Sequence, residues 1–500
     1  MSDTNKWVKG AIILTITGLI SRFLGMVYRV PLQNIAGDEG LYVYQQIYPL
    51  LSLAIILSLY GIPSAVTQQF SENQTSRQLF TRIFYLLTGL GILAWLVIYL
   101  FAQTWANMIG DIQLTEPIRM SSFMFLLLPM ISLLRGYFQS YEETHLVGIS
   151  QVVEQFVRVI LIIGTTFYVV STDRSLYELG ALAALATIIG SFVAVIYLGI
   201  KFLRRKNSVE VPPNNIPFRQ TAKWFFAGVF IYSLTYVLHL IFQAVDVMTM
   251  IPLLQEYGWS FEESKVQKGI FDRGNPMIQL GLVFGSSLAF ALIPSIQSKR
   301  KQGEAEQAVQ MTFLFSLAAA AGLIAIMPFL NPLFYLDQQG TTAIQWLMLL
   351  VFLLSLIITF SVLLQSIGYK QQQFKWIVFM FAVKIACNFW LIPIYGILGA
   401  SIASILSAAT LAFIFYWIWM KRSGIHLDLL FYMKAIVTIG FMYVVVVFVA
   451  QLFSIDATRL FLIIPTIVLS LVGVIVVFMM TWAMKLFPKD FLQNILKKSR

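Results

Sequence analysis

The feature that most constrains this chain is a series of apolar blocks, each of roughly 20 or more residues, separated by short polar breaks. A block of this length crosses a bilayer core of about 30 Å as one helix. Only 11% of the residues are charged, against about 25% in an ordinary soluble domain. We therefore predict an all-α integral membrane protein of about fourteen transmembrane helices.

The apolar blocks define the predicted spans. A polar start, MSDTNKWVKG, leads into an apolar stretch that carries two arginines, which favours a permanent first span over a cleavable signal peptide. The even number of spans puts both termini on one side of the membrane. The predicted spans are 8–33, 41–69, 82–104, 118–140, 149–171, 178–202, 224–252, 270–296, 308–330, 342–368, 376–394, 396–420, 435–453 and 460–484.

Lys and Arg predict the orientation. They cluster in alternate polar breaks, at 201–206, 299–301 and 497–500, whereas the other breaks contain acids such as Asp38, Glu39, Asp111, Glu116, Glu262 and Glu263. By the positive-inside rule this distribution predicts a multi-pass protein of the plasma membrane with both termini cytoplasmic. The net charge of +11 then indicates membrane lipids as partners, through their anionic headgroups, and no nucleic acid.

The two halves of the chain show a weak internal repeat. Ile62-Pro63-Ser64 recurs as Ile293-Pro294-Ser295 at nearly the same offset that relates Leu133-Leu134 to Leu363-Leu364. Parallel repeats of this kind build transporters whose substrate site lies between two lobes near the bilayer midplane. We predict an N-lobe (1–205), a cytoplasmic linker (206–222), a C-lobe (223–422), and a final segment (423–500) with two further helices and a cytoplasmic tail.

The first predicted span has the sharpest charge pattern. Gly18, Arg22, Gly25 and Arg29 share one helix face. This face predicts a cationic, closely approached surface that lines a cavity. The alternative is glycine-mediated helix packing with snorkelling arginines, which Arg29 could do from its position near the external end.

Other ionisable residues inside spans are candidates for substrate binding or for gating and ion coupling. Lys384, with Asn388 one turn later, is predicted to line the cavity, because no acid lies within a turn of it. Glu154 and Arg158 form an i, i+4 pair that either neutralises itself or takes part in coupling. Arg135 lies close enough to a span end to snorkel.

At the external ends of two later spans, Asp246, Asp272 and Arg273 allow either a structural Asp246–Arg273 bridge or a role in gating or ion coupling. His239 is more typical of a packing residue than of a ligand. Because the predicted span interiors hold more bases than acids, the cavity should attract an anion, and arginine suits phosphate.

Motifs of other functional classes are absent from the sequence. It contains no Walker-type loop, no HExxH, and no Cys/His metal spacing, and its single cysteine, Cys387, excludes an internal disulfide. We therefore predict a transporter without cofactors, rather than an enzyme or an ATP-driven pump.

Four segments carry a family resemblance: SRFLGMVYR (21–29), RGYFQSYEETHLVGISQVVEQFVRV (135–159), KGIFDRGNPMIQLG (268–281) and VKIACNFWLIPIYGILGASIAS (383–404). They resemble the oligosaccharidyl-lipid and polysaccharide flippase branch of the MOP exporter superfamily, in its MurJ- and SpoVB-like, Gram-positive form. The resemblance implies a two-lobed fold that flips undecaprenyl-pyrophosphate-linked sugars by alternating access. It also implies that Arg22 and Arg273 line a central cationic cavity. Arg29 lies one position later than the second basic residue of Gram-negative MurJ.

The predicted substrate is thus a lipid-linked anionic glycan, such as a peptidoglycan precursor, and cell-wall synthesis enzymes are candidate partners. One alternative is a MATE-like multidrug exporter, although cationic drugs need acids in the cavity. The other is an integral-membrane glycan polymerase or acyltransferase, which needs a positioned acid/base or nucleophile.

Overall fold

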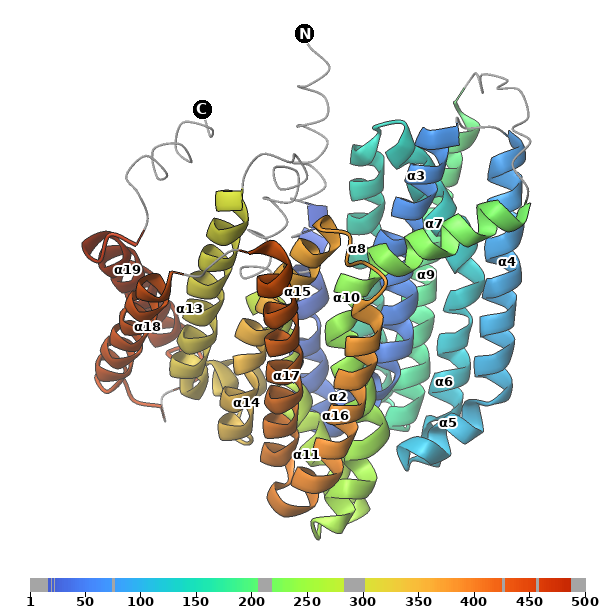
Figure 1. Ribbon diagram of the computed structural model, residues 1–500. Coiled ribbons are helices and arrows are strands. Elements are labelled where there is room, and N and C mark those ends of the chain that lie inside the picture. Colours follow the sequence, from blue (N-terminus) through green and yellow to red (C-terminus); the bar gives the residue numbers. More distant parts are fainter. Residues whose placement is uncertain are drawn as a thin grey trace. The chain divides into compact units, whose positions relative to one another are not determined.

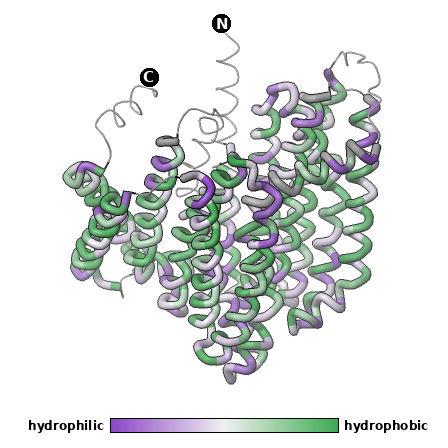
Figure 2. Tube along the Cα trace, viewed as in Figure 1, coloured by the Kyte–Doolittle hydropathy of each residue, from purple (hydrophilic) through white to green (hydrophobic). Residues whose placement is uncertain are grey.

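The computed structural model describes residues 17–18, 20–21, 23–73, 77–205, 218–282, 302–424, 428–455 and 458–486, which form helices and no strand (Figure 1). Twelve helical segments within these ranges are long and apolar enough to cross a membrane. Figure 2 shows apolar residues along most of their length, with many hydrophilic residues toward helix ends. The predicted all-α, multi-pass membrane fold is confirmed.

Packing divides the chain into two compact units, Met1–Asp272 and Arg273–Arg500. The helices of the first unit are α2 (Arg29–Ile56), the π-helix η1 (Leu57–Gly61), α3 (Ile62–Asn73), α4 (Arg77–Leu100), α5 (Ala102–Ile109), the 3-10 turn η2 (Ile112–Leu114), α6 (Thr115–Ser122), α7 (Met124–Ser140), α8 (Thr144–Ser171), α9 (Leu176–Leu203), α10 (Phe218–Glu256) and α11 (Phe261–Asp272).

The chain reverses within α2 at Gly37, whose φ of 70° suits glycine and separates two helices inside this element. A single apolar segment of 49 residues, Phe23–Ser71, therefore contains the end of the predicted span 8–33 and the whole of 41–69. Tyr28, Leu32 and Leu41, from both sides of the break, pack in one apolar cluster with residues of α8 and α9. The reversal brings polar residues of both halves of α2 into the interior of the unit.

The second unit contains α13 (Gln302–Tyr335), α14 (Thr341–Leu347), α15 (Leu349–Ser366), α16 (Gln373–Tyr395), α17 (Ile397–Ser423), α18 (Leu429–Ala450) and α19 (Ile463–Ala483). These helices match the predicted spans from 308–330 onward, with α14 and α15 together forming 342–368. The predicted span 270–296 runs beyond Leu282 into residues outside the described ranges.

The repeat remains a prediction. Ile293-Pro294-Ser295 and most of the predicted linker 206–222 lie outside the described residues. Packing groups α10 and α11 with the first unit, whereas the repeat assigns their sequence to the C-lobe. The boundary between packed units therefore differs from the boundary predicted between repeats.

Gly269 of α11 packs directly against the break in α2. A Cβ atom there would lie 2.0 Å from the backbone oxygen of Asp38, which cannot move aside as a flexible side chain can. We expect Gly269→Ala to destabilise the protein by about 1–3 kcal/mol, as overpacking does. The measurement is thermal unfolding of the purified protein in detergent.

Gly164→Ala in α8 is the matched control, because a Cβ atom at Gly164 meets nothing within 4 Å. This variant should unfold at or slightly above the wild-type temperature, since alanine favours a helix over glycine. Equal behaviour of the two variants would contradict the close packing of α11 on α2.

Candidate functional site

Arg29 begins α2 and is completely buried. Its guanidinium carbon lies 4.2 Å from the ring centroid of Tyr48 and 5.9 Å from that of Tyr28. The Tyr28 and Tyr44 hydroxyls hydrogen-bond to each other beside it. The alternative that Arg29 snorkels to the membrane surface is wrong, because the reversal at Gly37 folds the rest of α2 over its side chain.

None of the three guanidinium nitrogens of Arg29 makes a well-aligned hydrogen bond or an ion pair within the described residues, and its close polar neighbour is the Tyr28 hydroxyl. Tyrosine rings favour a cation by about 0.5–2 kcal/mol. That gain is small against the several kcal/mol that burial of an unpaired ion costs. A guanidinium held in this way is suited to receive an anion with its planar fork of donors.

One face of α10 carries several polar side chains, and one of them, His239, lies near this arginine. Tyr236, His239, Gln243 and Asp246 follow an i, i+3, i+7, i+10 spacing, which places them on the same side of the helix. The ring of Tyr236 stacks on Tyr60 of η1, with centroids 3.9 Å apart. His239 lies within range of the Arg29 charge, and its two buried ring nitrogens lack partners within the described part of the chain.

Buried amides and hydroxyls extend the same polar interior. They belong to α2 and α10, and each has at least one buried atom without a partner among the residues that the structure covers: Gln33, Gln45, Gln46, Ser52, Ser233 and Gln243. Each such atom costs about 1–3 kcal/mol when it stays unsatisfied. Buried polar atoms usually have partners in a folded protein, so the number of such atoms in α2 and α10 favours a binding interior over an ordinary core.

The acid nearest in charge interaction to Arg29, Asp272, already has a basic partner. The Lys268 ammonium donates to both carboxylate oxygens of Asp272, at 2.6 and 2.5 Å. Asp272 also interacts electrostatically with Asp246 and Arg29. Two of the predicted coupling residues, Asp246 and Asp272, are thus near each other, and Asp272 is also near Arg29.

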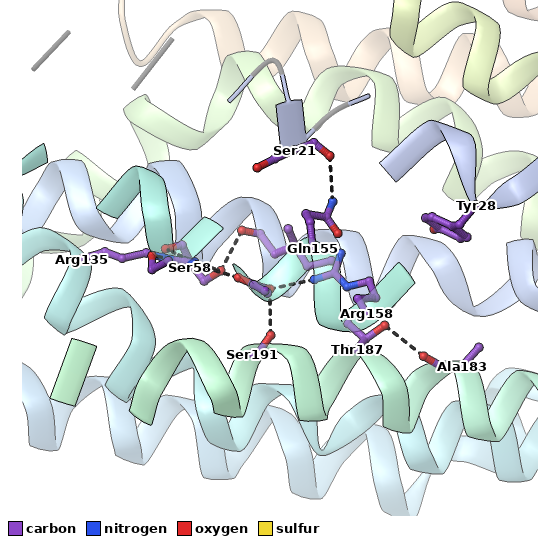
Figure 3. A network of polar contacts seen from close by, with 12 residues as sticks. Ser21, Tyr28, Ser58, Arg135, Gln155, Arg158, Ala183, Thr187 and Ser191 are labelled. Atoms are coloured by element: carbon purple, nitrogen blue, oxygen red, sulfur yellow. Dashed lines mark hydrogen bonds and ion pairs between the residues drawn. The ribbon is translucent and has the colours of Figure 1, made fainter. Parts of the chain in front are cut away.

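The predicted Glu154–Arg158 pair belongs to a larger buried network (Figure 3). Arg158 donates to one carboxylate oxygen of Glu154 at 2.7 Å and Arg135 donates to the other at 2.6 Å. Ser191 of α9 donates to the same carboxylate at 2.8 Å. The carboxylate thereby joins α7, α8 and α9, which favours the structural interpretation of Glu154 and Arg158 over the coupling one.

The expectation that Arg135 snorkels is wrong. Its side chain has no exposed surface, and its donors also meet Ser150 Oγ at 3.2 Å and the backbone oxygen of Ser58 in η1 at 3.4 Å. A π-helix frees a backbone carbonyl from the regular i−4 ladder, and here Arg135 takes up one of the carbonyls of this turn. Packing of α7 against η1 and α8 holds the guanidinium inside.

Lys384 of α16 is fully buried in the second unit. Its ammonium donates to Ser404 Oγ at 2.6 Å, to Asn388 Oδ1 at 2.9 Å and to the Ala400 backbone oxygen at 3.4 Å. These neutral oxygens of α16 and α17 position the ammonium. Asn388 therefore acts together with Lys384, as their spacing suggested.

Arg273 pairs with Asp337 in the second unit. Two guanidinium nitrogens donate to the two carboxylate oxygens at 2.7 and 2.9 Å. The ring centroid of Tyr335 lies 5.3 Å from the guanidinium carbon of Arg273. Burial alone would raise the pKa of Asp337, but the hydrogen bonds from Arg273 and from the Gln339 amide hold it below its ordinary value of 3.8. Asp337 is thus a carboxylate at neutral pH, and a phosphate that binds Arg273 must displace it.

Two ion-pair partners of the site residues, Lys268 and Asp337, were not predicted from the sequence. Lys268 and Asp272 have the i, i+4 spacing that identified Glu154 and Arg158, so the sequence contained that signal. Asp337 lies 64 residues from Arg273, and no local pattern connects them. Arg22 lies outside the described residues, so its place in the cavity stays a prediction.

The comparisons with known proteins agree with this architecture. The family model described as "Polysaccharide biosynthesis protein" matches residues 7–300. The chain is 36% identical over 420 residues to the uncharacterized membrane protein YabM of Bacillus subtilis (strain 168), covering 81% of this chain and 79% of that one. It is 24% identical over 453 residues to the lipid II flippase MurJ of the same organism, covering 84% and 83%.

A solved structure of the lipid II flippase MurJ, in an inward closed conformation, superposes with a TM-score of 0.71 at 13% identity, covering 97% of this chain and all of that one. This likeness concerns the fold. Together with the family match and the relatives, it assigns the chain. The protein belongs to the polysaccharide biosynthesis protein family, in the MurJ- and SpoVB-like branch of the MOP exporter superfamily.

Proposed function

We propose that the protein is a flippase that moves an undecaprenyl-pyrophosphate-linked saccharide from the inner to the outer leaflet by alternating access. The observation that carries this proposal is Arg29, a buried guanidinium without an ion pair among the described residues, in a unit whose α2 and α10 also carry buried glutamine amides. A pyrophosphate would satisfy the guanidinium, and the amides can donate to and accept from sugar hydroxyls.

Each site residue has a separate role in this proposal. Arg22 and Arg29 would bind the pyrophosphate in the first unit. Arg273, once released from Asp337, and Lys384 with Asn388 would bind anionic or hydroxyl groups of the same substrate. Asp246 and Asp272 would couple transport to an ion or to the membrane potential, because the sequence has no ATP site.

The finer proposal for the substrate is a peptidoglycan precursor. Its support is the similarity to MurJ of Bacillus subtilis, which is a lipid II flippase by name. The lipid tail would stay in the bilayer while the headgroup crosses the polar interior.

The test uses purified protein in proteoliposomes that carry fluorescent lipid-linked glycans. Transport makes the headgroups accessible to a membrane-impermeant quencher. We expect flipping of polyprenyl-pyrophosphate glycans and none of a cationic drug, whose charge Arg29 would repel. Drug export without glycan flipping would support the MATE-like alternative, and polymer formation in the same vesicles would support an enzyme.

A further inference from the structure

A groove lies between α16 and α17 in the second unit. It has a volume of about 510 Å³, and its walls include Tyr369, Trp376, Phe413, Trp417, Lys421 and Arg422. Most of the wall is aromatic or aliphatic, and the two basic residues lie together in the last turn of α17. An apolar trough with cationic residues at one end has the chemistry of a lipid site.

The apolar part of the groove faces outward. The side chains of Phe413 and Trp417 are 62% and 52% exposed, and their rings stack with centroids 6.3 Å apart. Exposed aromatic rings on a membrane helix contact lipid, and Trp and Tyr concentrate at the level of the headgroups. This wall can therefore hold an acyl chain, with one end of the groove near the membrane–water interface.

The basic residues are held at the groove instead of extending freely. The Lys421 ammonium lies 4.8 Å from the Trp417 ring centroid, and the Arg422 guanidinium lies 4.6 Å from that of Tyr369. Tyr369 is fixed in turn by the indole of Trp376, which donates to its hydroxyl at 3.2 Å. Within the described ranges, no ion pair neutralises Lys421 or Arg422.

Cations at a helix C-terminus interact favourably with the helix dipole. That interaction does not require a groove. Lys370, just before α16, and Lys375, in its first turn, add positive charge at this end of the groove. The positive-inside rule predicts this end to be cytoplasmic, which is the side where anionic lipids give basic residues the strongest attraction. Charge complementarity thus selects an anionic phospholipid over a zwitterionic one.

We propose that the α16–α17 groove binds one anionic phospholipid of the cytoplasmic leaflet, with its phosphate on Lys421 and Arg422 and an acyl chain along Phe413 and Trp417. This site is separate from the proposed transport site, and it does not depend on which substrate the protein moves.

The experiment places the purified full-length protein in nanodiscs with equal amounts of phosphatidylglycerol and phosphatidylcholine. Native mass spectrometry then measures which lipid stays bound to the protein after the protein is released from the nanodisc. We expect the wild type to retain one phosphatidylglycerol preferentially. The double variant Lys421→Gln with Arg422→Gln should lose about 25-fold in this preference, at about five-fold for each basic residue.

Two further variants separate a built site from general surface charge. Lys201→Gln with Arg204→Gln removes two exposed basic residues at the end of α9 and should leave the preference unchanged. Ile414 also lines the groove. Ile414→Trp fills the groove and keeps both charges, so it should abolish retention even though the positive charge remains. An equal loss in the α9 variant, or full retention in Ile414→Trp, would overturn the proposal. If the double variant does not fold, Ile414→Trp still decides the question.

Discussion

Replacement of Arg29 by alanine is expected to lower glycan transport by about 30-fold or more, because truncation of one partner of a buried charge pair costs about 2–5 kcal/mol. Stability should stay unchanged or rise, since the guanidinium is buried without an ion pair among the described residues. Arg29→Lys keeps the charge but loses the planar fork, so it should retain part of the activity. The measurements are flipping in proteoliposomes and thermal unfolding.

Arg119→Ala is the control for Arg29. It removes a partly exposed arginine of the same unit, which pairs with Glu116 at the surface, and it should transport normally. Arg22→Ala should behave like Arg29→Ala if the first-span arginines act together. Full transport by Arg29→Ala at normal abundance would mean that Arg29 only packs, and loss of folding would mean that its tyrosine contacts are structural.

Replacement of Glu154 by glutamine is expected to destabilise the first unit by roughly 3–5 kcal/mol, because it leaves Arg135 and Arg158 buried without their shared carboxylate. The melting temperature in detergent and the fraction of monodisperse protein measure this loss. Glu178→Gln in α9 is the control, since Glu178 forms a solvent-exposed i, i+4 pair with Arg174. Its melting temperature should change little.

Rescue distinguishes the three-residue network from a simple pair. If Glu154 and Arg158 formed a simple i, i+4 pair, Glu154→Gln with Arg158→Gln would largely restore stability. With Arg135 in the network, this double variant should recover only partly, and the added Arg135→Gln should recover more. Full recovery in the double variant would mean that Ser58 and Ser150 are sufficient partners for Arg135.

The sequence by itself determined the membrane fold. The apolar blocks predicted the spans because the bilayer accepts only segments of that length and polarity. Local spacing also identified Glu154 with Arg158 and Lys384 with Asn388, since residues four apart meet on a helix. Each of these inferences needs only the order of residues along one helix.

Tertiary structure alone decided which charges are compensated. Arg29 and Arg135 looked alike in sequence, as arginines near span ends that could snorkel. The reversal at Gly37 buries Arg29 against tyrosines, whereas packing of α7 on α8 gives Arg135 the carboxylate of Glu154. The cost of a buried charge depends on the groups that neighbouring helices bring to it, and their identity is set by packing between segments far apart in the chain.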